Sequence, residues 1–137
     1  MITPFARSLA RKSRRALRSA RLIHEDGDAE GAINRAYYAM LNIARAALLA
    51  GGVPEDNLPS THRDVIAALR QYAVQSGNID LEFAGALNRT DALRMQADYS
   101  ATEFDARSVT EAVARAESFV TAVERVFSLK PPGLPAV

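Results

Sequence analysis

The sequence contains no cysteine, and no apolar run in it approaches the roughly 20 residues needed to span a bilayer. The missing thiols exclude a disulfide framework and a thiolate metal site. The N-terminus runs straight into an arginine-rich segment, with no apolar stretch after it, which is unlike a secretory signal. Nothing in the chain resembles a phosphate-binding loop, a zinc site or a Ser-His-Asp set. We therefore expect a cytoplasmic protein that uses no metal and no other cofactor.

Acidic side chains are missing from one part of the chain. Residues 1–24 carry seven basic residues and no acid, whereas the rest carries ten basic and sixteen acidic residues, so the net charge of +1 hides a strong polarity. A polarised charge distribution affects which partners bind and how they approach more than it affects the fold.

Helix-forming residues dominate what is present. Alanine is abundant, and β-branched residues are scattered rather than alternating, which favours helix throughout. The 137 residues suit one domain, because two cores would each be too small to bury enough apolar surface. We expect an all-α antiparallel bundle of about five helices within residues 1–129, followed by a flexible tail at 130–137. Caps and breakers predict helices near 4–25, 29–50, 61–77, 80–97 and 102–129.

The expected second helix carries an unusual polar row. Arg35 and Asn42 are seven residues apart and lie nearly in line, with Tyr38 between them and Arg45 extending the row. Such a row is often only the solvated face of an amphipathic helix. A solvated face usually mixes glutamate with lysine, however, and this row has no acid beside its two arginines.

Three segments resemble the small stand-alone HEPN proteins, often found as the toxin-like partner of a minimal nucleotidyltransferase. The segments are NRAYYAM at 34–40, THRDV at 61–65 and RMQADY at 94–99. The resemblance implies a helical bundle that dimerises, with two copies of the second-helix motif facing each other across a cleft. In nuclease members an arginine and a histidine of this motif cut RNA without a metal.

Arg35 corresponds to that arginine, and the histidine position falls on Asn42. Metal-free cleavage needs groups that exchange protons near neutral pH, and an amide has no usable pKa there. Losing such help costs typically 10²–10⁴-fold in rate. We therefore name Arg35, Tyr38 and Asn42 as the candidate catalytic row and expect weak nuclease activity or none.

A second candidate surface lies on the first helix. Arginines spaced by 4, 3, 4 and 3 residues form a row along one side of it: Arg7, Arg11, Arg14, Arg18 and Arg21. This row, together with Arg45, suits binding to RNA or to an acidic partner, although a merely solvated face is an equal alternative. Acids elsewhere in the chain must offset its repulsion.

Residues of the other two matching segments are candidates for the wall of the site. His62, beside the capping Thr61, takes either a structural role or the place of the missing base. Arg94 and Asp98 are four residues apart and can pair on a helix, with Tyr99 after them. We favour a structural role for this last group.

Two function classes remain open from the sequence. One is an RNase toxin that a nucleotidyltransferase-like antitoxin inhibits. The other is a non-catalytic HEPN module that binds a nucleotide, RNA or a partner protein. In either class we expect a homodimer, because a single bundle would struggle to cover both faces of so apolar a second helix.

Overall fold

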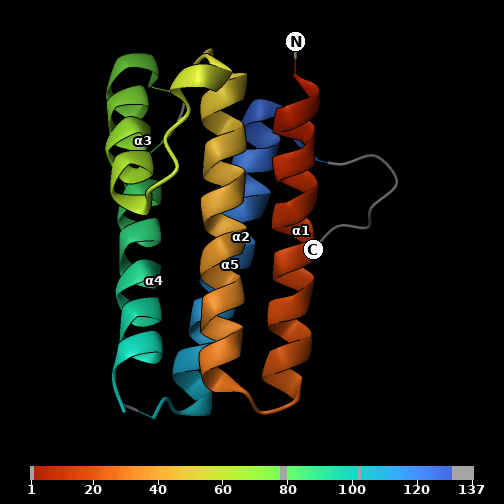
Figure 1. The fold of residues 1–137 in the computed structure, drawn as a ribbon, viewed down its shortest axis with the longest axis vertical. Helices are drawn as coiled ribbons and strands as arrows, with labels where there is room; N and C mark the ends of the chain where they lie inside the picture. The colour runs from red at the N-terminus through yellow and green to blue at the C-terminus, as the bar shows by residue number, and fades with distance from the viewer. Residues whose placement is uncertain (1, 78–79, 102, 131–137) are drawn as a thin grey trace.

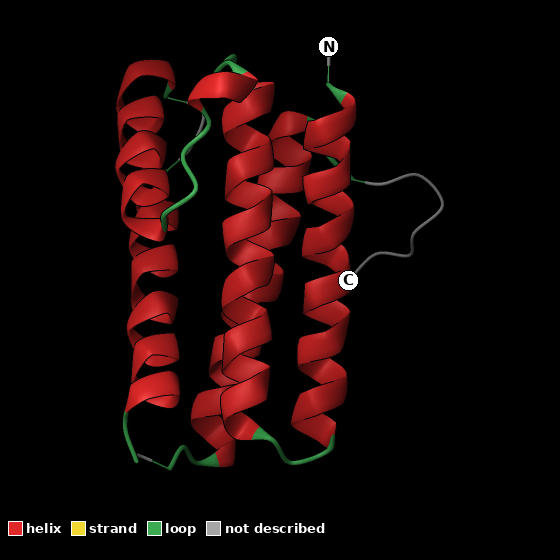
Figure 2. Cartoon of the chain, viewed as in Figure 1, coloured by secondary structure: helices red, strands yellow, loops and turns green. Residues whose placement is uncertain are grey.

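The computed structural model describes residues 2–77, 80–101 and 103–130, and all regular structure in these ranges is helical (Figure 2). The elements are α1 (Pro4–Glu25), α2 (Ala29–Ala50), the short 3-10 helix η1 (Glu55–Asn57), α3 (His62–Ser76), α4 (Leu81–Tyr99) and α5 (Ala106–Phe127). This confirms the expected all-α bundle of five helices.

The helices surround α2. Figure 1 shows α1 on one side of α2, α3 and α4 on the other, and α5 behind, and α2 contacts all four of them. The view leaves the front of α2 uncovered by any helix of the same chain. None of the helices in the described ranges has the length and apolar character that a membrane crossing requires.

Side-chain caps set where most helices begin, as the sequence predicted. Thr3 Oγ1 accepts a hydrogen bond from the Ala6 amide, and Asp28 Oδ1 accepts one from the Gly31 amide. Thr61 Oγ1 likewise accepts from the Asp64 amide at the start of α3. Each cap satisfies an amide that has no partner within its helix.

Two predicted boundaries were wrong. The fourth helix does not end near residue 97 as predicted, because α4 continues to Tyr99. The fifth helix does not open near residue 102, which lies outside the described residues. It begins at Ala106, with Asp105 as its cap accepting from the Ser108 amide at 2.7 Å. That hydrogen bond lowers the pKa of the Asp105 carboxyl.

The core is centred on α2, of whose 22 residues 13 are buried within one chain. Ile33, Tyr37, Met40 and Ala44 are all buried, and so are small residues such as Ala39 and Ala46. The premise that one bundle cannot cover so apolar a helix was therefore wrong. The homodimer itself stays a prediction that needs other support.

A buried ion pair joins the first and last helices. Arg14 Nε and Nη2 donate to the two carboxylate oxygens of Glu124 at 2.7 and 2.5 Å. The side chains are only 10% and 3% exposed. Two helical turns further along, Arg21 Nε pairs with Glu117 Oε1 of α5, and these side chains are more exposed than those of the first pair. These two acids of α5 neutralise this edge of the arginine row.

We predict that Glu124→Gln destabilises the fold. Removing one charge from a buried pair leaves the other uncompensated, so the free energy of unfolding should fall by about 3 kcal/mol in urea denaturation. Glu111→Gln is the matched control, because Glu111 pairs with Arg107 on the exposed side of α5. The control should change stability by less than about 0.5 kcal/mol. Equal effects of the two substitutions would contradict a structural role for the Arg14–Glu124 pair.

Candidate functional site

The predicted polar row of α2 lies on the strip of this helix that reaches the surface. Arg35, Tyr38, Asn42 and Arg45 are each partly exposed, whereas their neighbours Ala36, Ala39 and Ile43 are completely buried. The spacing of three and four residues therefore does place the row along one line, on the side of α2 left open by the other helices.

The side chains of Arg35 and Asn42 make no hydrogen bond or ion pair to any residue in the described ranges. Three other partly buried arginines, Arg14, Arg21 and Arg94, are held by carboxylates. Arg115 on α5 is also partly buried, and its buried Nη1 has no partner among the described residues. The Arg35 guanidinium and the Asn42 amide thus remain able to bind a ligand from outside the chain.

Arg45 has a different position in the site. Its Nε donates to the carbonyl oxygen of Pro59 at 3.0 Å, which ties α2 to the loop before α3. That loop leads directly into Thr61 and His62. Arg45 therefore helps to set where α3 begins, and only its terminal nitrogens remain for an external anion.

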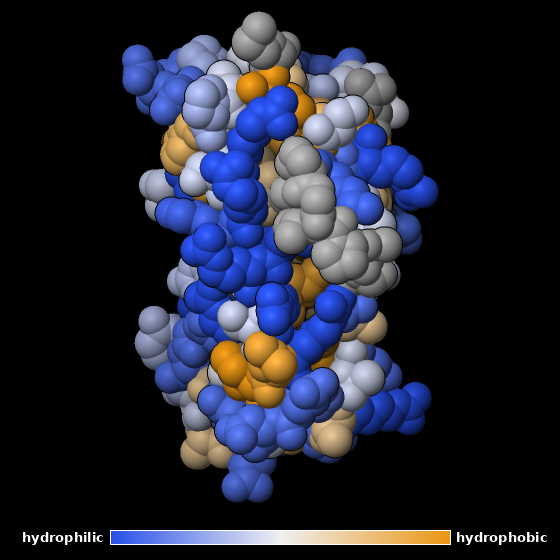
Figure 3. All heavy atoms as spheres, turned by 90° about the vertical axis from the view of Figure 1, so that its right-hand side faces the viewer, coloured by the Kyte–Doolittle hydropathy of each residue, from blue (hydrophilic) through white to orange (hydrophobic). Residues whose placement is uncertain are grey.

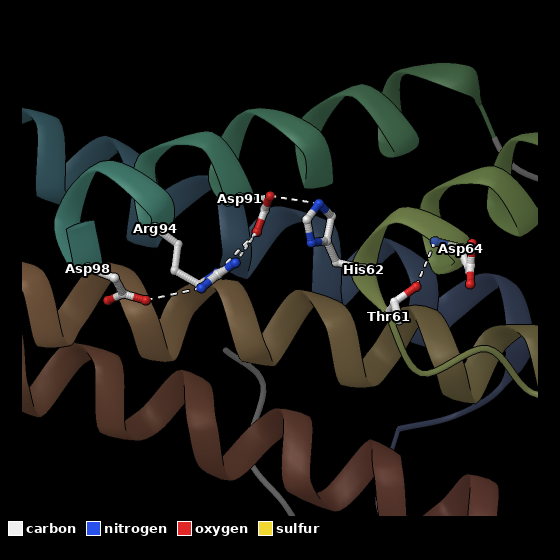
Figure 4. Close-up of polar contacts among 6 residues, drawn as sticks. All are labelled: Thr61, His62, Asp64, Asp91, Arg94 and Asp98. Carbon is white, nitrogen blue, oxygen red and sulfur yellow. Dashed lines mark hydrogen bonds and ion pairs between the residues drawn. The ribbon is translucent and has the colours of Figure 1, made fainter. Parts of the chain in front are cut away.

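A polar cluster lies where α3 meets α4 (Figure 4). His62 Nε2 is 2.7 Å from Asp91 Oδ2, and Arg94 Nη2 is 2.9 Å from Asp91 Oδ1. Arg94 Nη1 also contacts Asp98 Oδ2 at 3.0 Å. The predicted Arg94–Asp98 pair is therefore present, and it belongs to a larger network.

Asp91 is the central group of this cluster, and the sequence analysis missed it. Its side chain is 5% exposed, and each carboxylate oxygen has a cationic or potentially cationic partner. Residues 91, 94 and 98 follow the spacing i, i+3, i+7 on one face of a helix, which is a usable signal. The partner from α3 could not be read from that spacing.

Tyr37 connects this cluster to the polar row of α2. The Arg94 guanidinium carbon lies 4.8 Å from the centre of the Tyr37 ring, and the His62 ring meets Tyr37 edge-on at 6.1 Å. Tyr38, a member of the row, packs edge-on against Tyr37 at 5.1 Å. The row and the cluster are thus parts of one continuous region.

The surroundings keep Tyr37 neutral and Arg94 charged. Burial raises the pKa of the Tyr37 phenol, and the Asp91 charge raises it further. Burial lowers the pKa of Arg94, but the hydrogen bond and charge of Asp91 outweigh it, so the net shift is upward.

The chemistry available in this region is anion binding and proton exchange. Arg35 supplies an unpaired positive charge, and an imidazole held by a buried carboxylate is an arrangement suited to proton transfer. Tyr99, the third predicted wall residue, is 79% exposed at the last position of α4. Within the described ranges there is no group of three or more residues able to hold a metal ion.

The chain is similar to several known proteins. The family model described as HEPN domain matches residues 6–126. A "UPF0332 protein" of Thermotoga maritima is 32% identical over 117 residues, covering 85% of this chain and 86% of the relative. A second one, of Gloeobacter violaceus, is 30% identical over 99 residues, covering 72% and 75%. A protein of Methanocaldococcus jannaschii named "Putative toxin" is 30% identical over 112 residues, covering 80% and 78%.

We predict that Asp91→Asn destabilises the protein more than Asp98→Asn does. The first change takes the charge from between His62 and Arg94, leaving a largely buried guanidinium without its main partner. Urea denaturation near neutral pH should show a loss of about 2–3 kcal/mol. Asp98→Asn removes one charge from the more exposed end of the same network and should cost less than about 1 kcal/mol. Similar losses would contradict the central role of Asp91.

Tyr37 should also make stability sensitive to alkaline pH. Its pKa is raised in the folded chain, so the unfolded chain releases the phenol proton first as the pH passes its ordinary value of 10.0. Stability is therefore fully present below this pH and falls as the pH rises above it. Tyr37→Phe should lose less stability than the unaltered protein between about pH 9 and about pH 11 in denaturant titrations. Parallel curves for the two proteins would contradict the shift.

Proposed function

The chain belongs to the HEPN domain family, and we propose that it is the toxin component of a toxin–antitoxin pair, acting on RNA in the cytoplasm. The family match covers nearly the whole chain and confirms the resemblance found in the sequence. The name of the Methanocaldococcus jannaschii relative supports a toxin. The partner we propose, on the family resemblance, is a nucleotidyltransferase-like antitoxin.

The observation that carries this proposal is the unpaired Arg35 on the open strip of α2. The arginines that join elements of this fold have an internal acceptor, such as Glu124 for Arg14 and the Pro59 carbonyl for Arg45. Arg35 has none among the described residues and lies in line with Asn42, on the partly exposed strip of α2. A phosphate group would supply the missing counter-charge and would accept hydrogen bonds from the guanidinium fork.

The chemistry proposed for this row is cleavage by the 2′-hydroxyl of RNA. A base takes the 2′-hydroxyl proton, the 2′-oxygen attacks the phosphorus, and the bond to the 5′-oxygen breaks as that oxygen gains a proton. Arg35 would stabilise the charge that develops on the phosphate. Asn42 can orient the phosphate but cannot exchange the proton, so we expect cleavage to be slow.

A second copy of the chain would complete the site. The row of α2 lies on a face that one chain leaves open, and the family resemblance places two such rows opposite each other. We propose a twofold-symmetric homodimer in which this face is shared. This proposal no longer depends on burying the small residues of α2, which one chain already covers.

Asn42 supports one alternative function. With an amide in the histidine position, the same cleft would bind a nucleotide, RNA or a partner protein and leave the chemistry to others. The two candidates share Arg35 as the anion-binding group and differ in whether the fold still supports proton transfer.

We predict that Asn42→His increases RNA cleavage by about 10²-fold or more. The change restores a group that exchanges protons near neutral pH, in line with Arg35. Adding Arg35→Ala to Asn42→His should abolish the gain. Cleavage is measured with a labelled RNA oligonucleotide in the presence of a metal chelator.

Asn42→Gln is the control, because it changes the side chain without adding a titratable group, and it should give no gain. An Asn42→His protein that folds but stays inactive would contradict the nuclease proposal and favour the binding module. Efficient cleavage by the unaltered protein that survives Asn42→Ala would place the base elsewhere, and His62→Ala would then identify it.

A further inference from the structure

The structure divides the basic residues of α1 into two groups. Arg14 and Arg21 turn toward α5 and are neutralised by Glu124 and Glu117. The others are exposed and form no ion pair with the described residues: Arg7, Arg11, Lys12, Arg15 and Arg18. We call these five the α1 basic surface.

We propose that the α1 basic surface binds the sugar–phosphate backbone of RNA and holds it beside the row on α2. The choice of RNA among polyanions rests on the proposed function. The surface itself is separate from the Arg35 row, because it lies on the outer side of another helix.

The composition of this surface favours phosphates over an acidic protein. Four of its five cations are arginines, whose planar guanidinium groups bind phosphate oxygens in pairs. A protein interface normally has an apolar anchor at its centre. The one large apolar side chain exposed on α1 is Leu22, which lies beyond the last arginine of the surface.

The same surface is suited to binding the sugar–phosphate backbone of RNA rather than its bases. Binding of single strands through their bases uses exposed aromatic rings as stacking platforms. In the described residues, α1 exposes no aromatic side chain, since Phe5 is half-buried against the core. Binding through this surface should therefore depend little on nucleotide sequence.

The dimensions suit several phosphate contacts. Arg7 and Arg18 are eleven residues apart, which is about 16 Å along the helix axis. Figure 3 faces the side of the bundle where α1 lies, and hydrophilic residues form a nearly continuous column along it. No acid lies within α1 before its last residue, Glu25, so the charged side chains that the helix contributes along this surface are all positive.

The packing of α1 on α2 places this surface level with the candidate site. Ser13 Oγ donates to the carbonyl oxygen of Ala39 at 2.7 Å, which fixes the relative height of the two antiparallel helices. Ala39 lies midway between Arg35 and Asn42 along α2. Lys12 is two residues from Arg14, about 200° around the helix, and so lies on the flank away from α5. An RNA strand on the outer side of α1 thus passes at the height of the α2 row.

The test compares two charge-matched triple variants by equilibrium binding of a fluorescent mixed-sequence RNA oligonucleotide at several salt concentrations. Arg7, Arg11 and Arg18 are changed together to glutamine in the first. The control changes Arg63, Arg70 and Arg89, which are exposed on α3 and α4 at the opposite side of the bundle (Figure 1). Arg14 is left intact, because its substitution would disturb the fold.

The first variant should flatten the slope of log affinity against log salt by about 2, at about 0.7 for each lost single-strand phosphate contact. The control should keep the slope of the unaltered protein. Circular dichroism of all three proteins checks that they are folded.

Equal weakening by both variants would overturn the proposal, because it would show attraction to net charge alone. The absence of RNA binding by the unaltered protein at low salt would overturn it too. So would displacement of the RNA by polyglutamate at matched charge, which would indicate a surface for acidic proteins.

Binding is measured without cleavage, so these outcomes are independent of the result for Asn42→His. If the α1 basic surface proves not to bind RNA while the Asn42→His protein cleaves RNA, only this inference is refuted. If the surface binds RNA while the Asn42→His protein is inactive, only the nuclease proposal is refuted.

Discussion

The burial of α2 constrains every other feature of this protein. Because α1, α3, α4 and α5 all pack against this one helix, its sequence is small or apolar around most of its circumference. Polar side chains can remain only on the strip that reaches solvent, and Arg35, Tyr38, Asn42 and Arg45 occupy it. The close packing of alanines such as Ala39 also lets α1 approach closely enough for Ser13 to reach the backbone of α2. The same packing that holds the bundle together thus fixes the line of the candidate site.

Asp91 plays a comparable part where α3 joins the bundle. A carboxylate this deeply buried needs partners that repay its desolvation, and it has one on each oxygen. One of them, His62, is the first residue of α3, and the other, Arg94, lies over the ring of Tyr37 on α2. Three helices are therefore joined by one ionisable group. Since Tyr38 packs on Tyr37, the position of the candidate row also depends on this contact.

Much of this could be predicted from the sequence, because the signals are local. Caps such as Thr3 and Asp28 act within one turn, and the row of α2 follows from helical periodicity alone. The contacts that were missed join residues far apart in the chain, as His62 and Asp91 are, and depend on how the helices pack. The end of α4 was missed for a smaller reason, since the Arg94–Asp98 pair and the cap by Ser100 extend the helix past the expected stop. One long-range pairing did leave a signal, because Arg14 and Arg21 repeat at seven residues, and so do Glu117 and Glu124.

The arginines of α1 and α2 separate into structural and available groups by a single criterion, the presence of an internal acceptor. Burying a guanidinium is costly unless a carboxylate or carbonyl accepts its protons, and Arg14, Arg94 and Arg45 each have one. Sequence spacing could not make this division, because Arg14 and Arg18 belong to the same row of α1 and only packing against α5 distinguishes them. Among the described arginines of α1 and α2, those without an internal acceptor are Arg35 and the four arginines of the α1 basic surface. Both lie at the height where Ser13 meets Ala39, which is the arrangement that the proposed path of one RNA strand along α1 and α2 requires.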